Sequence, residues 1–200
     1  MKNSYFMQIP EMLYDAEIIK GGLDTTVFFK RPISQSYRDD ARVKLESDTN
    51  MNQPEMLDYP KEFSVTGFGC YLERGTSIED TNEIFNGGVF SFAVRGYRSL
   101  FSQPLMVFPN FCRDRQSSED VKDALGKALT RIIGGNVVDV SASQKLRDIL
   151  PLVWPDDQEA LRIKSGEAFS IGVEFPHGLK LSKPVRMMVV IDGYAWVPKK

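Results

Sequence analysis

A strict alternation of large apolar residues with small or polar ones, near the end of the sequence, constrains the fold most. Every second residue of segment 169–175, FSIGVEF, is large and apolar. Because successive side chains of a strand point to opposite faces of a sheet, this segment predicts a strand with one buried face. After a turn rich in proline comes segment 185–197, in which residues 187–191 are apolar at every position. Such a strand needs cover on both faces, so the two segments predict a sheet inside a larger β structure.

Four further segments carry strand signals. They are rich in β-branched and aromatic residues and are bounded by turn residues; they span residues 25–31, 61–73, 89–95 and 104–109. In segment 61–73 the apolar face changes at Gly67 and Gly69, which predicts a bulge or bend. Prolines frame segment 104–109, which favours a place at the edge of a sheet.

Helical periodicity is concentrated in one region. Residues 118–133 carry apolar side chains at spacings of three and four, begin with acidic residues and end before two glycines, which predicts a helix. A second, shorter helix is expected over residues 143–150, before a proline. Together these helices define a predicted helical insertion at residues 114–149. Residues 77–85 predict one more short helix, capped by Thr76 or Ser77.

The first 24 residues show no sustained periodicity. We interpret residues 1–24 as an N-terminal arm that a neighbouring molecule orders, with a short helix as an alternative over residues 11–19. The remaining residues, 25–200, are expected to form a single domain. The apolar side chains of the arm that could serve assembly are Tyr5, Phe6, Met7 and Ile9.

The order of these segments predicts the fold class. Strands joined by short turns, without regular alternation of strand and helix, favour a mainly β, antiparallel sandwich over a parallel α/β sheet. A chain of 200 residues is long enough for one such domain with a sizeable core.

Composition argues against several classes of function. The net charge is −2 and no basic block occurs, so the electrostatic footprint of a sequence-specific nucleic-acid-binding protein is missing. No apolar run approaches the roughly eighteen residues that a membrane helix needs. The N-terminal segment also lacks the apolar centre of a secretory signal. Cys70 and Cys112 are the only cysteines, and we interpret them as two buried thiols rather than a disulfide.

The sequence contains no recognisable catalytic, cofactor-binding or metal-binding motif. His177 is the only histidine, and its Pro-His-Gly setting indicates a solvated turn residue. Gly67 and Gly69 lack the third glycine of a dinucleotide-binding loop and lie in a predicted strand. Adjacent carboxylates fall in polar loops, where solvation explains them better than acid–base catalysis. We therefore predict a protein that is not an enzyme and that holds no cofactor or metal.

Three aromatic residues near the end of the chain leave two interpretations open. Trp154, Tyr194 and Trp196 could form a stacking platform for sugars, because flat rings cover the apolar faces of sugar rings. They could equally be core or interface residues, since Tyr and Trp are enriched at protein–protein contacts. We favour the core or interface interpretation and keep the stacking platform as the alternative.

Three stretches share a pattern beyond their strand signals. Residues 59–73, YPKEFSVTGFGCYLE, look like the strand that introduces a barrel core. Residues 80–109, DTNEIFNGGVFSFAVRGYRSLFSQPLMVFP, combine a short helix, a strand, a turn and a proline-ended strand. In residues 165–198, SGEAFSIGVEFP is followed after a short loop by PVRMMVVIDGYAWVP. The second segment ends with DGY and a short apolar tail. In these stretches, which cover roughly half of the chain, the sequence resembles the single jelly-roll capsid proteins of icosahedral bacterial and archaeal viruses.

The resemblance implies a function as well as a fold. It implies one antiparallel jelly-roll sandwich or barrel, decorated by the insertion at residues 114–149 and preceded by the arm. It implies a non-enzymatic capsid subunit, major or minor, that self-assembles in the host cytoplasm and resides in the virion. The implied partners are copies of the chain, other capsid proteins, and an underlying membrane or minor virion protein. The alternative is a carbohydrate- or receptor-binding module of a virion spike.

Overall fold

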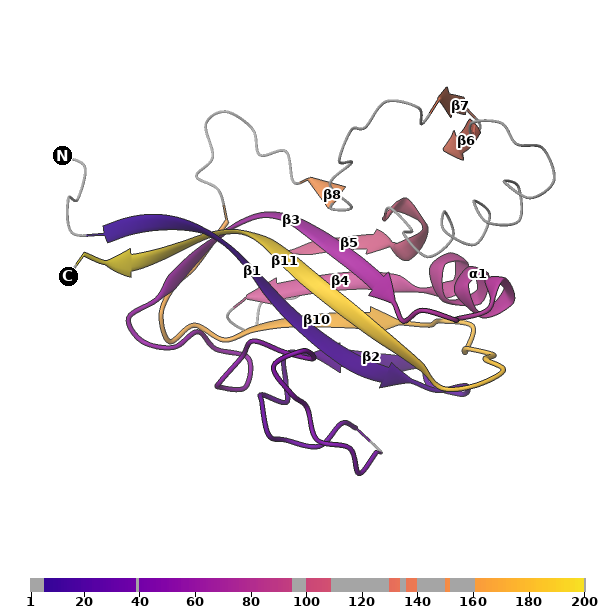
Figure 1. The fold of residues 1–200 in the computed structure, drawn as a ribbon, viewed down its shortest axis with the longest axis horizontal. Coiled ribbons are helices and arrows are strands. Elements are labelled where there is room, and N and C mark those ends of the chain that lie inside the picture. Colours follow the sequence, from indigo (N-terminus) through magenta and orange to yellow (C-terminus); the bar gives the residue numbers. More distant parts are fainter. Residues whose placement is uncertain are drawn as a thin grey trace.

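Two antiparallel sheets, packed face to face, make up most of the described molecule (Figure 1). The structure is a computed structural model. It describes residues 6–38, 40–94, 100–108, 130–133, 136–139, 150–151 and 161–199.

The larger sheet is built around the two longest strands. Its members are β1 (Phe6–Ile19), β11 (Val185–Pro198), β3 (Glu62–Leu72), β8 (Leu150–Pro151) and β9 (Arg162–Ile163). The strand order is β1-β11-β3-β8, and β9 also pairs with β3. β1 and β11 are paired along their whole length, from Phe6 opposite Pro198 to Ile19 opposite Val185. Segments from the two ends of the described chain therefore lie side by side.

The smaller sheet contains the strands with the clearest alternation. It consists of β2 (Thr25–Phe28), β10 (Phe169–Glu174), β4 (Val89–Val94) and β5 (Phe101–Pro104), in the order β2-β10-β4-β5. In β4 and β10 every second side chain is buried, as the two-residue period predicts. The strands predicted over residues 89–95 and 169–175 are thus confirmed over residues 89–94 and 169–174.

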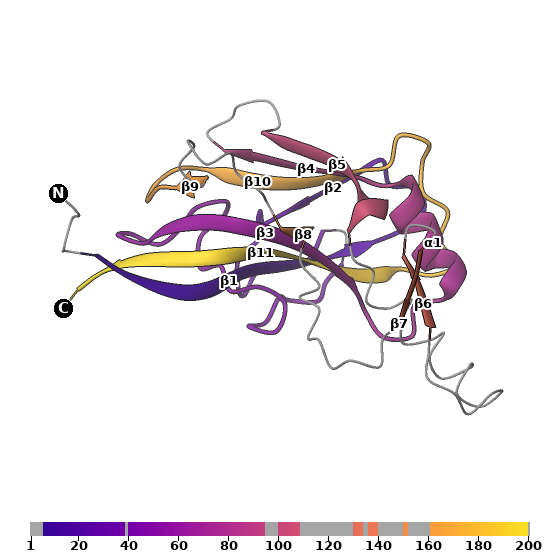
Figure 2. The same cartoon turned by 90° about the horizontal axis from the view of Figure 1, so that it is seen from above.

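Aromatic rings fill the space between the two sheets. Phe68 of β3 lies with its ring centroid 5.1 Å from Phe90, 5.0 Å from Phe92 and 5.4 Å from Phe101. The rings are tilted with respect to one another, a geometry that aromatic quadrupoles favour. This cluster ties strands of both sheets into one core. Figure 2 shows the two sheets edge-on.

A bulge interrupts the pairing of β3 with β11. The register shifts between Asp192 and Gly193, opposite the β3 segment that contains Thr66 and Gly67. The backbones approach closely there, because a Cβ on Gly193 would lie only 1.9 Å from the Ser64 carbonyl oxygen. The bulge expected from Gly67 is confirmed. On the opposing strand, β11, the close approach requires a glycine at position 193.

One helix, α1 (Ile78–Gly87), caps an end of the sandwich together with the short 3-10 helix η1 (Leu105–Val107). As expected, Ser77 is the cap: its hydroxyl accepts a hydrogen bond from the Asp80 N–H at 3.0 Å. Asp80 in turn accepts a hydrogen bond from the Ser182 N–H at 2.8 Å, which joins the helix to the loop before β11. No helix among the described residues has the length and hydrophobicity that crossing a lipid bilayer requires.

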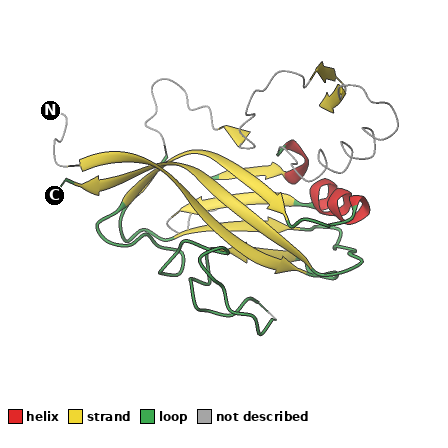
Figure 3. Cartoon of the chain, viewed as in Figure 1, coloured by secondary structure: helices red, strands yellow, loops and turns green. Residues whose placement is uncertain are grey.

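A long loop, residues 29–61, connects β2 to β3 along the side of the sandwich where β1 and β2 lie (Figure 3). Backbone hydrogen bonds within the loop, such as Lys44 N–H to the Gln35 carbonyl at 2.8 Å, give it a defined path. An isolated bridge pairs Asp15 of β1 with Thr49 of the loop. The loop therefore covers part of the free edge of β1.

The N-terminal arm prediction is wrong over residues 6–19. These residues form β1 inside the larger sheet, and neither a helix at residues 11–19 nor an arm ordered only by a neighbour describes them. The physical reason is the partner strand. β11 pairs with β1 along its whole length, and Leu13 and Ile19 are buried in the core. The local sequence of β1 has no periodicity that would predict this pairing.

Two predictions in the region of residues 104–149 also need correction. Residues 105–107 form η1 rather than a strand, and β5 ends at Pro104, although it is an edge strand as expected. The helix expected over residues 118–133 is wrong at its end, because β6 (Thr130–Ile133) pairs with β7 (Asn136–Asp139). Those segments are rich in β-branched residues, which favour strands. The rest of the predicted insertion lies outside the described residues.

Candidate functional site

Tyr194 and Trp196 lie on the outer face of the larger sheet. They are two residues apart in β11, so both point away from the core, whereas Ala195 between them is buried. Tyr194 is opposite Ser64 of β3, and Trp196 is opposite Glu62. The Trp196 indole N–H donates a hydrogen bond to the Ser64 hydroxyl at 2.8 Å, which fixes the orientation of the ring.

Arg162 of β9 completes this arrangement. Its guanidinium lies over the Trp196 ring, 4.3 Å from the ring centroid, in a cation–π contact. Its Nε is 2.6 Å from Glu62 Oε2, but the N–H has no aligned acceptor, so the contact is an ion pair rather than a good hydrogen bond. Stacking and charge pairing hold the indole and the guanidinium together, so these two side chains are already ordered at the surface.

Apolar and polar groups surround the two rings. Met12 of β1 is 51 % exposed and sits opposite Asp192, while Tyr194 is 39 % exposed. The Thr66 hydroxyl donates to the Asp192 carboxylate at 3.0 Å. We define the outer-face patch as Met12, Glu62, Arg162, Tyr194 and Trp196. Its mixture of rings, a thioether and an ion pair is typical of protein–protein contact sites.

The paired strands β1 and β11 form a long ribbon, and its other face is also apolar. Met7 and Ile9 are on the face of β1 that carries Leu13 into the core, yet they are 46 % and 38 % exposed. The reason is visible in Figure 2, where the ends of β1 and β11 run beyond the smaller sheet. Phe6 is half-buried at the start of the strand. The predicted assembly residues Phe6, Met7 and Ile9 are thus ribbon residues, and Tyr5 lies outside the described residues.

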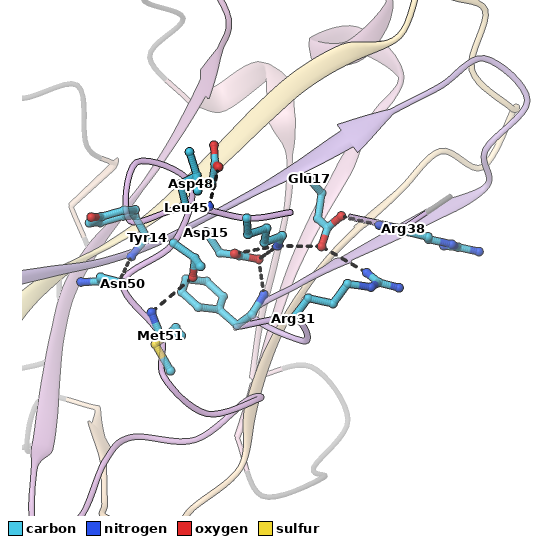
Figure 4. Close-up of polar contacts among 12 residues, drawn as sticks. Tyr14, Asp15, Glu17, Arg31, Arg38, Leu45, Asp48, Asn50 and Met51 are labelled. Atoms are coloured by element: carbon cyan, nitrogen blue, oxygen red, sulfur yellow. Dashed lines mark hydrogen bonds and ion pairs between the residues drawn. The ribbon is translucent and has the colours of Figure 1, made fainter. Parts of the chain in front are cut away.

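A cluster of buried charges lies between β1 and the 29–61 loop (Figure 4). Asp15 and Glu17 of β1 point toward the interior, and the loop contributes Lys44. The Lys44 Nζ is 2.8 Å from Asp15 Oδ1, 3.0 Å from Asp15 Oδ2 and 2.8 Å from Glu17 Oε1. The side chains of Lys44 and Asp15 are 0 % exposed, and that of Glu17 is 1 % exposed.

Three further donors reach the carboxylates of the cluster, among them the Arg38 backbone N–H, which donates to Glu17 Oε2 at 3.4 Å (Figure 4). The Phe29 backbone N–H donates to Asp15 Oδ2 at 2.6 Å, and Arg31 Nη1 lies 3.1 Å from Glu17 Oε1. Phe29 adopts a φ of 65°, which is unusual for a residue with a side chain. Burial raises the pKa of Asp15 to about 6, and the nearby Lys44 ammonium only partly opposes this effect.

The positions of the remaining candidate residues from the sequence are as follows. His177 is exposed in the turn after β10. Cys70 is buried and free, and burial raises the pKa of its thiol. Trp154 and Cys112 lie outside the described residues. Within the described ranges, no three His, Cys, Asp or Glu side chains gather as metal ligands would.

Sequence reasoning missed the buried cluster. The signal was Asp15 and Glu17 spaced two apart in an otherwise apolar stretch, LYDAEII. That spacing puts both carboxylates on one face only if the segment is a strand, whereas the sequence favours an arm over residues 1–24, with a helix over residues 11–19 as the alternative. Nothing in the local sequence indicates that Lys44, 29 residues beyond Asp15, faces them.

Comparisons of the chain with protein-family models, with curated proteins and with solved structures give no match.

Proposed function

We propose that the chain is a structural subunit of a virus shell, built on a single jelly roll, that assembles with copies of itself and other shell proteins. The observation that carries this proposal is the pattern of strand pairing. With β8 and β9 counted as one interrupted strand, and the separate β6–β7 pair left aside, the two sheets contain eight strands. The first strand pairs with the eighth, the second with the seventh, the third with the sixth and the fourth with the fifth.

This nested pairing is what a long antiparallel ribbon acquires when it is rolled into two sheets. Rolling also brings the eighth strand beside the third and the seventh beside the fourth, and β11–β3 and β10–β4 are such pairs. Double-sheet jelly rolls of eight strands occur in viral capsid and lectin domains. The pairing therefore supports the fold that the sequence resemblance implies, and it favours the shell and binding classes of function.

The exposed surfaces favour assembly. The β1–β11 ribbon presents Met7 and Ile9 on one face, and on the other it carries Met12, Tyr194 and Trp196 of the outer-face patch. Contacts on two faces of one projecting element allow one subunit to touch two neighbours, and symmetry repeats each contact around a shell. Weak contacts repeated in this way can give a stable particle, because a contact between subunits that other contacts already hold in one assembly forms at a high effective concentration.

Assembly is tested by native mass spectrometry and electron microscopy of the purified protein. We expect closed particles or discrete high-mass oligomers. In the double variant Ile9→Glu with Tyr194→Glu, which charges both faces of the ribbon, we expect assembly to fail while the circular dichroism spectrum stays unchanged. The matched control is Met106→Glu, because Met106 is 64 % exposed but lies in η1.

Deleting residues 1–20 is not a suitable test, because it would remove all of β1 and two members of the buried cluster. A wild-type chain that remains a monomer at every pH, salt and protein concentration would contradict the proposal. Equal loss of assembly in the Met106→Glu control would show that the ribbon has no special part in it.

One observation favours a second candidate, a carbohydrate- or receptor-binding module. Tyr194 and Trp196 are neighbours on one exposed face beside the carboxylates of Glu62 and Asp192. Rings that stack on sugars, with carboxylates that accept hydrogen bonds from hydroxyls, make up a sugar site. A glycan array probed with wild type and with Tyr194→Ala tests this candidate: specific binding that the variant loses supports it, and absence of binding by the folded wild type rejects it.

A further inference from the structure

The buried cluster contains the groups that an amide-forming reaction needs. An amine, Lys44 Nζ, lies within 3.0 Å of both oxygens of the Asp15 carboxyl group, and therefore close to the carbon that joins them. A second carboxylate, Glu17, contacts the same amine at 2.8 Å. All three side chains are at most 1 % exposed, so bulk water does not compete for the acyl carbon.

From this arrangement we propose that Lys44 and Asp15 condense into an intramolecular isopeptide bond, with Glu17 as the proton acceptor. The bond would join β1 to the 29–61 loop. This inference concerns the chain itself and is independent of the assembly proposed above.

The surroundings match the steps of the reaction. Held close together, the two groups react with a high effective concentration, since little translational freedom remains to be lost. The Phe29 N–H, 2.6 Å from Asp15 Oδ2, can stabilise the oxyanion that forms when the amine attacks. Phe29 is held there with a φ of 65°, and backbone outliers of this kind cluster at functional sites. Burial also raises the pKa of Asp15, which favours the protonated and therefore electrophilic acid.

The atoms balance without any added reagent. Lys44 begins as an ammonium ion and gives one proton to the Glu17 carboxylate. The neutral amine attacks Cγ of the protonated Asp15, and a new N–Cγ bond forms. The Cγ–OH bond then breaks, and the hydroxyl takes a second proton from the nitrogen and leaves as water. The amide keeps one N–H, Glu17 keeps the first proton, and no atom is oxidised or reduced.

Glu17 is the group whose replacement is most informative. As a general base it contributes on the order of 100-fold or more to the rate. Glu17→Gln keeps the length of the side chain and its hydrogen-bonding oxygen but cannot accept the proton. We therefore expect a folded variant in which Asp15 and Lys44 stay separate over times that complete the reaction in wild type.

The chain also contains an internal control. Lys61 also pairs with a carboxylate of β1, that of Glu11, but none of the other carboxylates in the described part of the chain contacts it, and both side chains are partly exposed. The proposal predicts no bond between Lys61 and Glu11, because the amine lacks a proton acceptor and water is present.

The test is mass spectrometry of the purified full-length protein under denaturing conditions. We expect a mass lower than that of the sequence by one water molecule. Trypsin should not cleave after Lys44, and residues 3–20 and 43–61 should appear as one branched peptide. In Asp15→Asn the same attack would release ammonia, so a deficit of one ammonia molecule would also support the proposal.

The proposal is wrong if folded wild-type protein, after prolonged incubation, shows the full mass and normal cleavage after Lys44. It is equally wrong if the deficit maps to residues other than Asp15 and Lys44. If Glu17→Gln forms the bond as fast as wild type, the assigned role of Glu17 is overturned. Circular dichroism and a cooperative melting transition confirm that each protein tested is folded.

Discussion

Replacing Gly193 by alanine should strongly destabilise the protein. Gly193 sits at the β3–β11 bulge, where an added Cβ would lie 1.9 Å from the Ser64 carbonyl oxygen and 2.7 Å from the Phe63 ring. Carbon and oxygen normally approach to about 3.3 Å even in the close Cα–H contacts of sheets. The alanine therefore requires a shift of more than 1 Å by backbone at the centre of the larger sheet.

The magnitude follows from the packing of the site. Ser64 cannot move freely, because its hydroxyl accepts the Trp196 N–H and its strand lies between β11 and β9. Added methyl groups in a packed core cost typically 1–3 kcal/mol. Because the clash is with backbone rather than a flexible side chain, we expect the upper end, about 3 kcal/mol. With a urea slope of about 2 kcal/mol per molar, the unfolding midpoint would fall by about 1.5 M.

Urea titration followed by circular dichroism measures this change. The matched control is Gly87→Ala at the end of α1, where an added Cβ meets nothing within 4 Å. Alanine should there gain about 0.4–1 kcal/mol, because it restricts the unfolded chain. A loss below about 1 kcal/mol for Gly193→Ala would refute the argument from close backbone approach, since overpacking of this kind rarely costs less.

Three further predictions concern the core and its titratable groups. Val189→Asp should prevent cooperative folding, because it places an unpaired carboxylate at a fully buried position opposite Asp15, and soluble protein with a sharp melting transition would contradict this. In Glu17→Gln, where Asp15 stays free, protonation of Asp15 should still stabilise the fold, because burial is the largest cause that raises its pKa. The gain should be smaller than the roughly 3 kcal/mol that a pKa of about 6 implies, because the variant lacks the Glu17 charge that also raises this pKa. The stability is present below about pH 4 and is lost as the pH rises through the folded pKa of Asp15, below about 6; the added substitution Asp15→Asn should abolish the dependence in urea titrations. In Cys112→Ser, the Cys70 thiol should react with a thiol reagent only after unfolding, because it is buried and its pKa is raised, and rapid labelling of folded protein would show that β3 opens.

Local patterns predicted the strands of the core well. Alternation at residues 89–95 and 169–175, and the fully apolar centre of 185–197, identified β4, β10 and β11, because the burial pattern of these strands follows from their own residues. The cap at Ser77 and the bulge near Gly67 were readable for the same reason, since both depend on adjacent residues.

What failed depends on residues far apart in the chain. β1 has no clean period, because its core-facing positions include Met7 and Ile9 beyond the smaller sheet and the charges of Asp15 and Glu17. Its strand conformation is set by β11, which follows it by more than 160 residues. The buried cluster was missed for the same reason, because Lys44 pairs with Asp15 and Glu17, which are far from it in the sequence. Tyr194 and Trp196 were found, but their association with Arg162 required the structure.

The pairing of β1 with β11 has a consequence for synthesis of the protein. A ribosome adds about 5–20 residues per second, so β1 would wait on the order of ten seconds for its partner strand to be made. During that time the nascent chain carries an unpaired strand with the charges of Asp15 and Glu17 already in its sequence. Charges pointing inward are a known protection against wrong strand pairing. The two carboxylates would thus keep the nascent chain soluble before Lys44 and β11 enclose them.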